Sequence, residues 1–239
     1  MWPFTKRRTI EQTHYLQGWT DFHCHILPGV DDGFQNTDDS LEALRAYEHL
    51  GIKEVWLTPH TMEDTPNTTE GLRQRFEEFR STYLDYVCEE DEGRGLEKVT
   101  LHLASEYMMD NLFEKHLEDN DFLTLDTYGN QVLVETSYFK PPYDLFGKLE
   151  RLKSLGYFPV LAHPERYMYM HDDDYKRLKD MDVRFQLNLA SLGGGYGSHV
   201  KDKAIRMLRQ RWYNYQGTDL HKLETLVGII DIDSKPLLQ

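Results

Sequence analysis

Short apolar runs and longer helical patterns alternate along the chain. Apolar residues recur at helical spacing over residues 37–50, which predicts a helix with Thr37 as its N-cap and Gly51 as its stop. Buried strands are expected at residues 19–27, 54–58, 99–104, 131–135, 159–162 and 184–189, and further helices at 70–88, 143–155, 173–181 and 198–212. Strands that alternate with helices predict an α/β fold of parallel βαβ units around one sheet.

A single domain is expected over residues 19–239, because no Gly/Ser linker or short repeat divides the sequence. Residues 1–18 are expected to form a solvated leader. Trp2 and Phe4, beside three basic residues, leave a membrane contact as the alternative, although the tract lacks the apolar core of a signal peptide. No apolar run approaches the roughly 18 to 20 residues that span a bilayer.

The chain is strongly acidic, with a formal net charge of −14. This charge argues against a nucleic acid or an anionic membrane as the main partner. A phosphate-bearing substrate is still compatible with it, because bound cations reverse the local field. The two cysteines, Cys24 and Cys88, are too few for a disulfide scaffold and favour a reducing cytoplasm.

Residue types that bind metals stand at the ends of several predicted strands. His23 and His25 are two apart in the first strand, which places both imidazoles on one face. In α/β barrels such strand ends converge on one rim, where active sites lie. Core packing does not explain the set, because a buried histidine or carboxylate costs free energy unless it is paired. The other candidates are His60, Glu106, Glu135, His163, Asp219 and His221.

The order of these motifs resembles the polymerase and histidinol phosphatase (PHP) superfamily. The motifs are HxH at 23–25, DDG at 31–33, TPH at 58–60, Glu106, Glu135, AHPER at 162–166 and DLH at 219–221. More narrowly, the runs FHCHILPGVDDGFQNTDDS and VLAHPERY resemble the manganese-dependent protein-tyrosine phosphatases of bacterial capsule and exopolysaccharide systems. The resemblance extends from Thr20 to His221 and implies a distorted (β/α)7 TIM-like barrel, the PHP fold.

The resemblance also implies three divalent metal ions. It assigns His23, His25, Glu106 and Asp219 to the first ion, Glu106 as a bridge to the second with Glu135 and His163, and Asp32, His60 and His221 to the third. Mixed imidazole and carboxylate ligands suit Mn²⁺, with Fe or Zn²⁺ as alternatives. Cys24 lies between the two histidines and should face the other side of the strand, so we interpret it as a packing residue and not as a nucleophile.

The activity implied is hydrolysis of phosphotyrosine, with metal-activated water attacking phosphorus directly. The substrate would be the tyrosine-rich tail of a bacterial tyrosine kinase that controls polysaccharide export. One alternative keeps the fold but changes the substrate to a small phosphomonoester such as histidinol phosphate. Another is a non-catalytic metal-binding scaffold, which the full ligand set disfavours. The long match around residues 31–40 favours the protein substrate over the small one.

Several further residues are candidates for binding the substrate. Arg166, three residues past His163, could clamp a phosphate in bidentate fashion, with a surface ion pair as the alternative. Asp32 could also carry a proton to the leaving phenolate, and Asp21 could orient a ligating histidine or be a surface charge. Lys222 stands where the related phosphatases have a polar loop with another arginine, and could supply a second positive charge or be a surface lysine. Aromatic residues that could line a wide cleft are Tyr107, Tyr138, Phe139 and Tyr143.

Overall fold

The computed structural model describes residues 7–90, 98–126 and 128–238, with the backbone alone for residues 88–90. The strands in this part of the chain form two parallel sheets. One sheet has the order β1 (Thr20–Cys24), β2 (Glu54–Leu57) and β4 (Thr100–Leu103). The other has the order β3 (His60–Thr61), β5 (Glu106–Met108), β6 (Gln131–Glu135), β7 (Phe158–Ala162), β8 (Arg184–Asn188) and β9 (Tyr215–Gly217).

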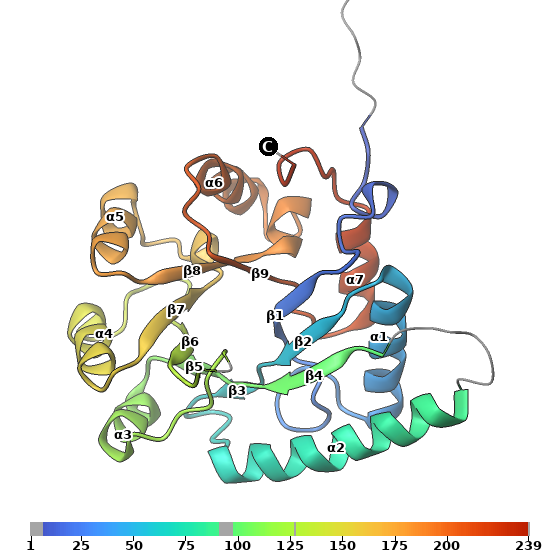
Figure 1. The fold of residues 1–239 in the computed structure, drawn as a ribbon. Coiled ribbons are helices and arrows are strands. Elements are labelled where there is room, and N and C mark those ends of the chain that lie inside the picture. Colours follow the sequence, from blue (N-terminus) through green and yellow to red (C-terminus); the bar gives the residue numbers. More distant parts are fainter. Residues whose placement is uncertain (1–6, 91–97, 127, 239) are drawn as a thin grey trace, which may run out of the picture.

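The two sheets continue into one ring. β2 leads into β3 and β4 leads into β5, and bonds from Ala104 N to Leu57 O (2.9 Å) and from Glu106 N to Pro59 O (3.1 Å) carry the pairing across both breaks. Beyond β9, the carbonyl of Leu220 accepts a hydrogen bond from the backbone N–H that follows β1. The described strands therefore occupy seven positions around a closed ring (Figure 1), which confirms the expected distorted (β/α)7 barrel.

Helices lie around the outside of this ring (Figure 1), as parallel crossovers require. In the described residues the α-helices are α1 (Thr37–Leu50), α2 (Thr69–Glu90), α3 (Asn111–Asp119), α4 (Leu145–Ser154), α5 (Asp172–Asp180), α6 (Ser198–Arg209) and α7 (Leu223–Ile230). Three short 3-10 helices are η1 (Glu11–Thr13), η2 (Pro164–Arg166) and η3 (Leu189–Gly193). None of the helices in this part of the chain is long and apolar enough to cross a membrane.

Helix ends differ from the sequence prediction where a side-chain cap decides them. The N-cap of α1 is Asn36 and not Thr37, because the Asn36 side chain accepts a hydrogen bond from Asp39 N at 2.9 Å. Helix α4 begins two residues later than expected, since Asp144 caps it. Helix α6 ends at Arg209, three residues before the expected end. The sequence patterns missed α3, α7 and the short strands β3, β5 and β9.

The interior of the barrel holds a small apolar cluster beneath the rim. Leu133 belongs to this cluster, whereas its neighbours Val132 and Val134 pack in a larger cluster with α4, as the alternation along a strand requires. Glu135 lies two residues after Leu133 in the same strand, so its side chain is on the same face of the sheet. The inner cluster therefore forms the floor under the polar side chains at the C-terminal end of the strands.

Residues 7–18 pack against the domain, in contrast to the solvated leader that we expected. Ile10 and Leu16 are almost fully buried, in the apolar cluster that also contains Leu41 and Leu44 of α1. The backbone of this segment also pairs with residues near the end of the chain, through Ile10 N to Ile232 O (2.9 Å) and Ser234 N to Arg8 O (2.9 Å). Trp2 and Phe4, on which the membrane alternative rested, lie outside the described residues.

We predict that Ile10→Ala lowers the free energy of unfolding by about 2 to 4 kcal/mol, because the truncation leaves a cavity in a packed core. Glu11→Ala, one residue along at an exposed position, should change it by less than about 0.5 kcal/mol. Urea unfolding followed by circular dichroism measures both. Equal stabilities for the two variants would contradict the packing of this segment.

Candidate metal centre

The structure brings all nine candidate metal ligands together at one rim of the barrel. They come from β1 and the loop after it, from β3, from the start of β5 and the end of β6, and from the segments after β7 and β9. In that order they are His23, His25, Asp32, His60, Glu106, Glu135, His163, Asp219 and His221. Parallel strands all deliver their C-terminal ends to this rim, which is why residues up to 198 positions apart meet there.

The first group contains His23, His25, Glu106 and Asp219, as the resemblance implied. The two Nε2 atoms are 3.1 Å apart. His23 Nε2 is 3.2 Å from Glu106 Oε2, and His25 Nε2 is 3.4 Å from Asp219 Oδ1. Atoms at these separations can share one ion at roughly 2.0 to 2.2 Å from each, the usual bond length for nitrogen and oxygen ligands.

The other two groups share His60. Its Nδ1 lies 3.1 Å from Glu106 Oε2 and 3.0 Å from Glu135 Oε1, while its Nε2 lies 3.5 Å from Asp32 Oδ1. His163 joins the Glu106 side, with Nε2 at 2.9 Å from Glu106 Oε1. His221 joins the Asp32 side at 3.4 Å. Geometry thus places His60 beside two groups, whereas the resemblance assigned it to the third ion alone.

Buried polar atoms without a partner show that this cluster fits metal ions. In the described part of the chain they include His60 Nδ1, and Glu106 Oε2 and Glu135 Oε1, which lie 3.1 and 3.0 Å from that nitrogen but make no hydrogen bond of acceptable geometry. A buried polar atom that makes no hydrogen bond costs free energy, so such atoms are rare in proteins. Bound cations would satisfy these atoms, and their spread over the cluster favours more than one ion.

The electrostatics of the cluster keep its carboxylates ionised. Burial disfavours the charged forms, but the surrounding histidines still lower the pKa of Glu106 and of Asp219 well below the usual range. In the reverse direction, burial lowers the pKa of His23, and Glu106 and Asp219 outweigh it and raise that pKa to about 9. Divalent cations would replace the protons that these imidazoles share with the carboxylates.

Two of the candidate ligand histidines have their ring orientation set by a hydrogen bond at Nδ1. His23 Nδ1 donates to Gln186 Oε1 (2.9 Å), and His25 Nδ1 donates to Asp31 Oδ2 (2.7 Å). Each bond leaves the lone pair of Nε2 directed at the cluster. Sequence reasoning missed both partners, although Asp31 stands in the DDG motif beside Asp32.

Asp21 has a different role from the one we expected. It is fully buried and not a surface charge. Its carboxylate accepts hydrogen bonds from the backbone N–H of His23 (3.1 Å) and of Thr218 (3.0 Å), and from the Tyr47 hydroxyl (2.6 Å). Asp21 therefore fixes the backbones that carry His23 and Asp219, and it does not touch an imidazole nitrogen.

The backbone is strained where two of the candidate ligands sit. His163 has φ of 32° and Asp219 has φ of 53°, a region that residues other than glycine rarely adopt. Such strain costs of order 1–3 kcal/mol and persists where the surrounding structure enforces it, often at functional sites. Here it turns both side chains toward the cluster at the ends of β7 and β9.

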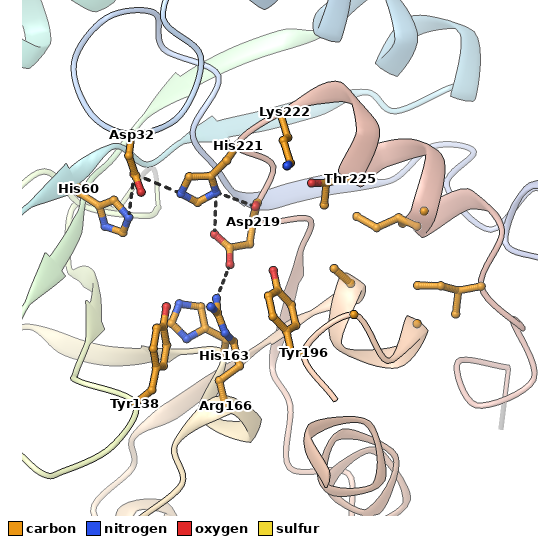
Figure 2. A pocket seen from close by; sticks show the side chains of 16 residues that line it. Asp32, His60, Tyr138, His163, Arg166, Tyr196, Asp219, His221, Lys222 and Thr225 are labelled. Atoms are coloured by element: carbon orange, nitrogen blue, oxygen red, sulfur yellow. Dashed lines mark hydrogen bonds and ion pairs between the residues drawn. The ribbon is translucent and has the colours of Figure 1, made fainter. Parts of the chain in front are cut away.

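A cleft of about 840 Å³ opens onto the cluster. Figure 2 shows Arg166 within it, close to Asp219. Arg166 Nη1 donates to Asp219 Oδ2 at 2.9 Å, and its guanidinium lies 4.2 Å from the ring centre of Tyr138 and 4.2 Å from that of Tyr196. The arginine is thus held from three sides inside the cleft, and its ion pair is with a candidate ligand and not with a surface residue. Lys222 also lines the cleft.

Of the four aromatic residues expected in a cleft, Tyr138 alone lines this one. Tyr107 is buried in the outer core, where its hydroxyl accepts a hydrogen bond from Leu123 N. Phe139 and Tyr143 are exposed on the loop after β6. Sequence reasoning missed Tyr196, which has no neighbouring motif to mark it.

Cys24 is buried and contacts the backbone carbonyl of Trp56. Burial raises the pKa of its thiol, so Cys24 is not a nucleophile.

A seven-position parallel barrel with clustered imidazole and carboxylate ligands at its C-terminal rim defines a barrel-type, metal-dependent enzyme. Comparison with known families makes the assignment narrower. The chain belongs to the CpsB/CapC family of capsular polysaccharide synthesis, whose model matches residues 19–227. This membership confirms the resemblance to the capsule-system phosphatases.

The relatives of this chain carry consistent names. It is 26% identical over 210 residues to the tyrosine-protein phosphatase YwqE of Bacillus subtilis, with 86% of this chain and 78% of the relative covered. It is 25% identical over 215 residues to the tyrosine-protein phosphatase CpsB of Streptococcus pneumoniae, with coverage of 86% and 84%. A crystal structure from work on these two proteins, described there as metal-dependent tyrosine phosphatases, superposes with a TM-score of 0.75 at 24% identity over 92% and 84% of the two chains, and supports the fold.

We predict that His23→Ala reduces the content of bound divalent metal while the far-ultraviolet circular dichroism stays unchanged. The variant removes one candidate ligand of the buried group, while the pairing of β1 with β2 runs through backbone atoms that the substitution keeps. His199→Ala, at an exposed position on α6, is the matched control and should keep the wild-type content. Mass spectrometry of the dialysed proteins measures the bound metal per chain. An unchanged metal content in His23→Ala would exclude His23 as a ligand.

We predict that Asp31→Asn weakens metal binding by about 10- to 100-fold, because the second partner of a ligating histidine sets its orientation and basicity. Asp31 also accepts from His60 N (2.9 Å), so the change affects two groups. Asp38→Asn makes the same chemical change at an exposed position of α1 and should leave the affinity unaltered. Competition titration with a chromogenic chelator measures both, and equal affinities would refute the role of Asp31.

Proposed function

We propose that this protein is a metal-dependent protein-tyrosine phosphatase of a bacterial capsule or exopolysaccharide system. The position of Arg166 supports this proposal most. Its guanidinium is fixed by Asp219 inside a cleft, next to the buried cluster of candidate metal ligands. Family membership and the names of the relatives agree with it. The substrate that we propose is the phosphorylated tyrosine-rich tail of a tyrosine kinase on the cytoplasmic side.

The proposed cofactor is three divalent ions, with Mn²⁺ first and Fe or Zn²⁺ as alternatives. The three groups of candidate ligands would hold them, and His25, His60 and Glu106 each belong to two of these groups. When bound, such ions acidify water to supply a nucleophile and neutralise charge on the phosphoryl oxygens.

The residues around the cluster would bind and orient the phosphoryl group. One nitrogen of Arg166 is engaged by Asp219, which leaves its other N–H groups free to donate to phosphoryl oxygens in a planar fork. Tyr138 and Tyr196 limit the movement of the guanidinium, so less conformational entropy is lost on binding. Lys222 is exposed at the start of α7 and would add a second positive charge.

Asp32 fits the role of ligand better than that of proton carrier. A hydrogen bond with His221, with further help from the charges of His221 and His60, lowers the pKa of its carboxyl to about 2 against the effect of burial. A carboxyl group this acidic holds almost no proton near neutral pH, and it is a poor donor to a leaving phenolate. As an anion it is well suited to a cation shared with the two histidines.

The metal-loaded protein should hydrolyse a phosphotyrosine peptide at least about 10-fold faster, in kcat/KM, than a phosphoserine peptide or histidinol phosphate, because a phenyl ring makes contacts in the cleft that a serine side chain or a smaller ester lacks. Release of inorganic phosphate from Mn²⁺-loaded protein measures all three rates.

A strong chelator should abolish the activity, and Mn²⁺ should restore it. Preference for histidinol phosphate would favour the small-substrate alternative. Absence of hydrolysis with every substrate would favour the scaffold alternative, provided that the protein carries metal.

A further inference from the structure

The cleft extends well beyond the metal centre. From Asp32 and His60 it runs past Asp219 into a second part between η3 and α7. Figure 2 shows Tyr196 and Thr225 on the side of Asp219 that faces away from Asp32 and His60. We call this second part the distal arm, and define it by Gly193, Gly195, Thr225, Gly228, Ile229 and Ile232.

The distal arm differs in chemistry from the end that holds the candidate ligands. The six residues that define it carry no charge, whereas the other end has Arg166 and Asp219, and Lys222 stands beside Thr225 at the border of the arm (Figure 2). Those six residues offer no side-chain charge to a ligand, so the charged groups within its reach are Lys222 at the border and the residues at the other end. The arm therefore suits an uncharged part of a ligand whose charged part lies at the cluster.

Two glycines keep the arm open. A Cβ added to Gly195 or to Gly228 would meet no atom within 4 Å, so both positions border open space. Neither has a backbone conformation that requires glycine. At Gly193, by contrast, a Cβ would lie 3.2 Å from the Ile232 side chain, which shows that the arm is closed at this point.

We infer that the distal arm binds the uncharged peptide segment next to the phosphotyrosine, in extended form. This inference rests on the proposed function. A cleft of about 840 Å³ is at the upper end of the range of about 300 to 1,000 Å³ for pockets that enclose a drug-sized ligand. A small phosphomonoester held at Arg166 would leave the arm unfilled. A peptide continues on both sides of its phosphotyrosine, and the arm continues from the cluster far enough to take the segment on one of these sides.

The test is the variant Gly228→Phe, which places a large side chain in the arm without disturbing a packed neighbour. Phenylalanine is a better helix former than glycine, so α7 should persist. Val227→Phe is the matched control, because Val227 is 65% exposed on the same helix and does not line the cleft. Gly195→Leu narrows the arm from the opposite wall and serves if Gly228→Phe fails to fold.

Gly228→Phe should raise KM for a phosphotyrosine peptide about 10-fold, while kcat/KM for p-nitrophenyl phosphate stays within about twofold of wild type. Val227→Phe should match wild type with both substrates. Equal losses on the two substrates, or no loss on either, would overturn the inference.

Fluorescence anisotropy with a labelled phosphotyrosine peptide gives an independent readout that needs no turnover. Weaker binding to Gly228→Phe than to wild type supports the arm, and equal binding overturns it. A wild-type protein that binds the peptide in the arm but releases no phosphate would contradict the proposed function while leaving the arm intact.

Discussion

The metal centre depends on the hydrogen bonds that close the barrel between β9 and β1. Asp219 N donates to His23 O at 2.8 Å, and His25 N donates to Leu220 O at 2.9 Å. These bonds hold β1 and the segment after β9 in register. As a result, the pair His23 and His25 lies next to the pair Asp219 and His221. Asp21 reinforces the same junction from below by accepting from both backbones. A slip of one residue here would turn every ligand on one side away from the cluster.

Asp219 shows how the centre and the substrate end of the cleft are connected. Its Oδ1 faces the imidazoles of His23 and His25, while its Oδ2 accepts from Arg166 and from Asn188 Nδ2 at 2.7 Å. One carboxylate thus contacts the metal-ligand group and the phosphate-binding candidate together. Its desolvation is offset only while both sides are occupied, since a buried charge that loses its partners is strongly destabilising. The affinity for phosphate at Arg166 and the affinity for metal are therefore expected to depend on each other through Asp219.

Much of this could be predicted from the sequence, and the remainder has identifiable physical causes. Strand β6 has the predicted limits, while β3 has two residues and too little pattern to detect. The ligand types were detectable because they lie at or near the ends of predicted strands and most of them belong to short motifs. Gln186 and Asn188 are ordinary amides in a strand sequence, and only the ring of strands brings them to His23 and Asp219. Tyr196 and the distal arm arise in the same way, from loops whose packing no local pattern specifies.

The acidic charge of the chain also bears on which phosphate esters can bind. Charges on the surface act over roughly 8 to 10 Å at ordinary salt concentrations, so they matter most to a ligand that covers a wide area. A polyanion such as a nucleic acid would meet that repulsion along its whole length on a protein of net charge −14. A single phosphoryl group inside the cleft would be governed instead by Arg166, by Lys222 and by any cations held in the cluster. The net charge therefore disfavours a polyanion, and it remains compatible with a ligand that carries a single phosphoryl group into the cleft.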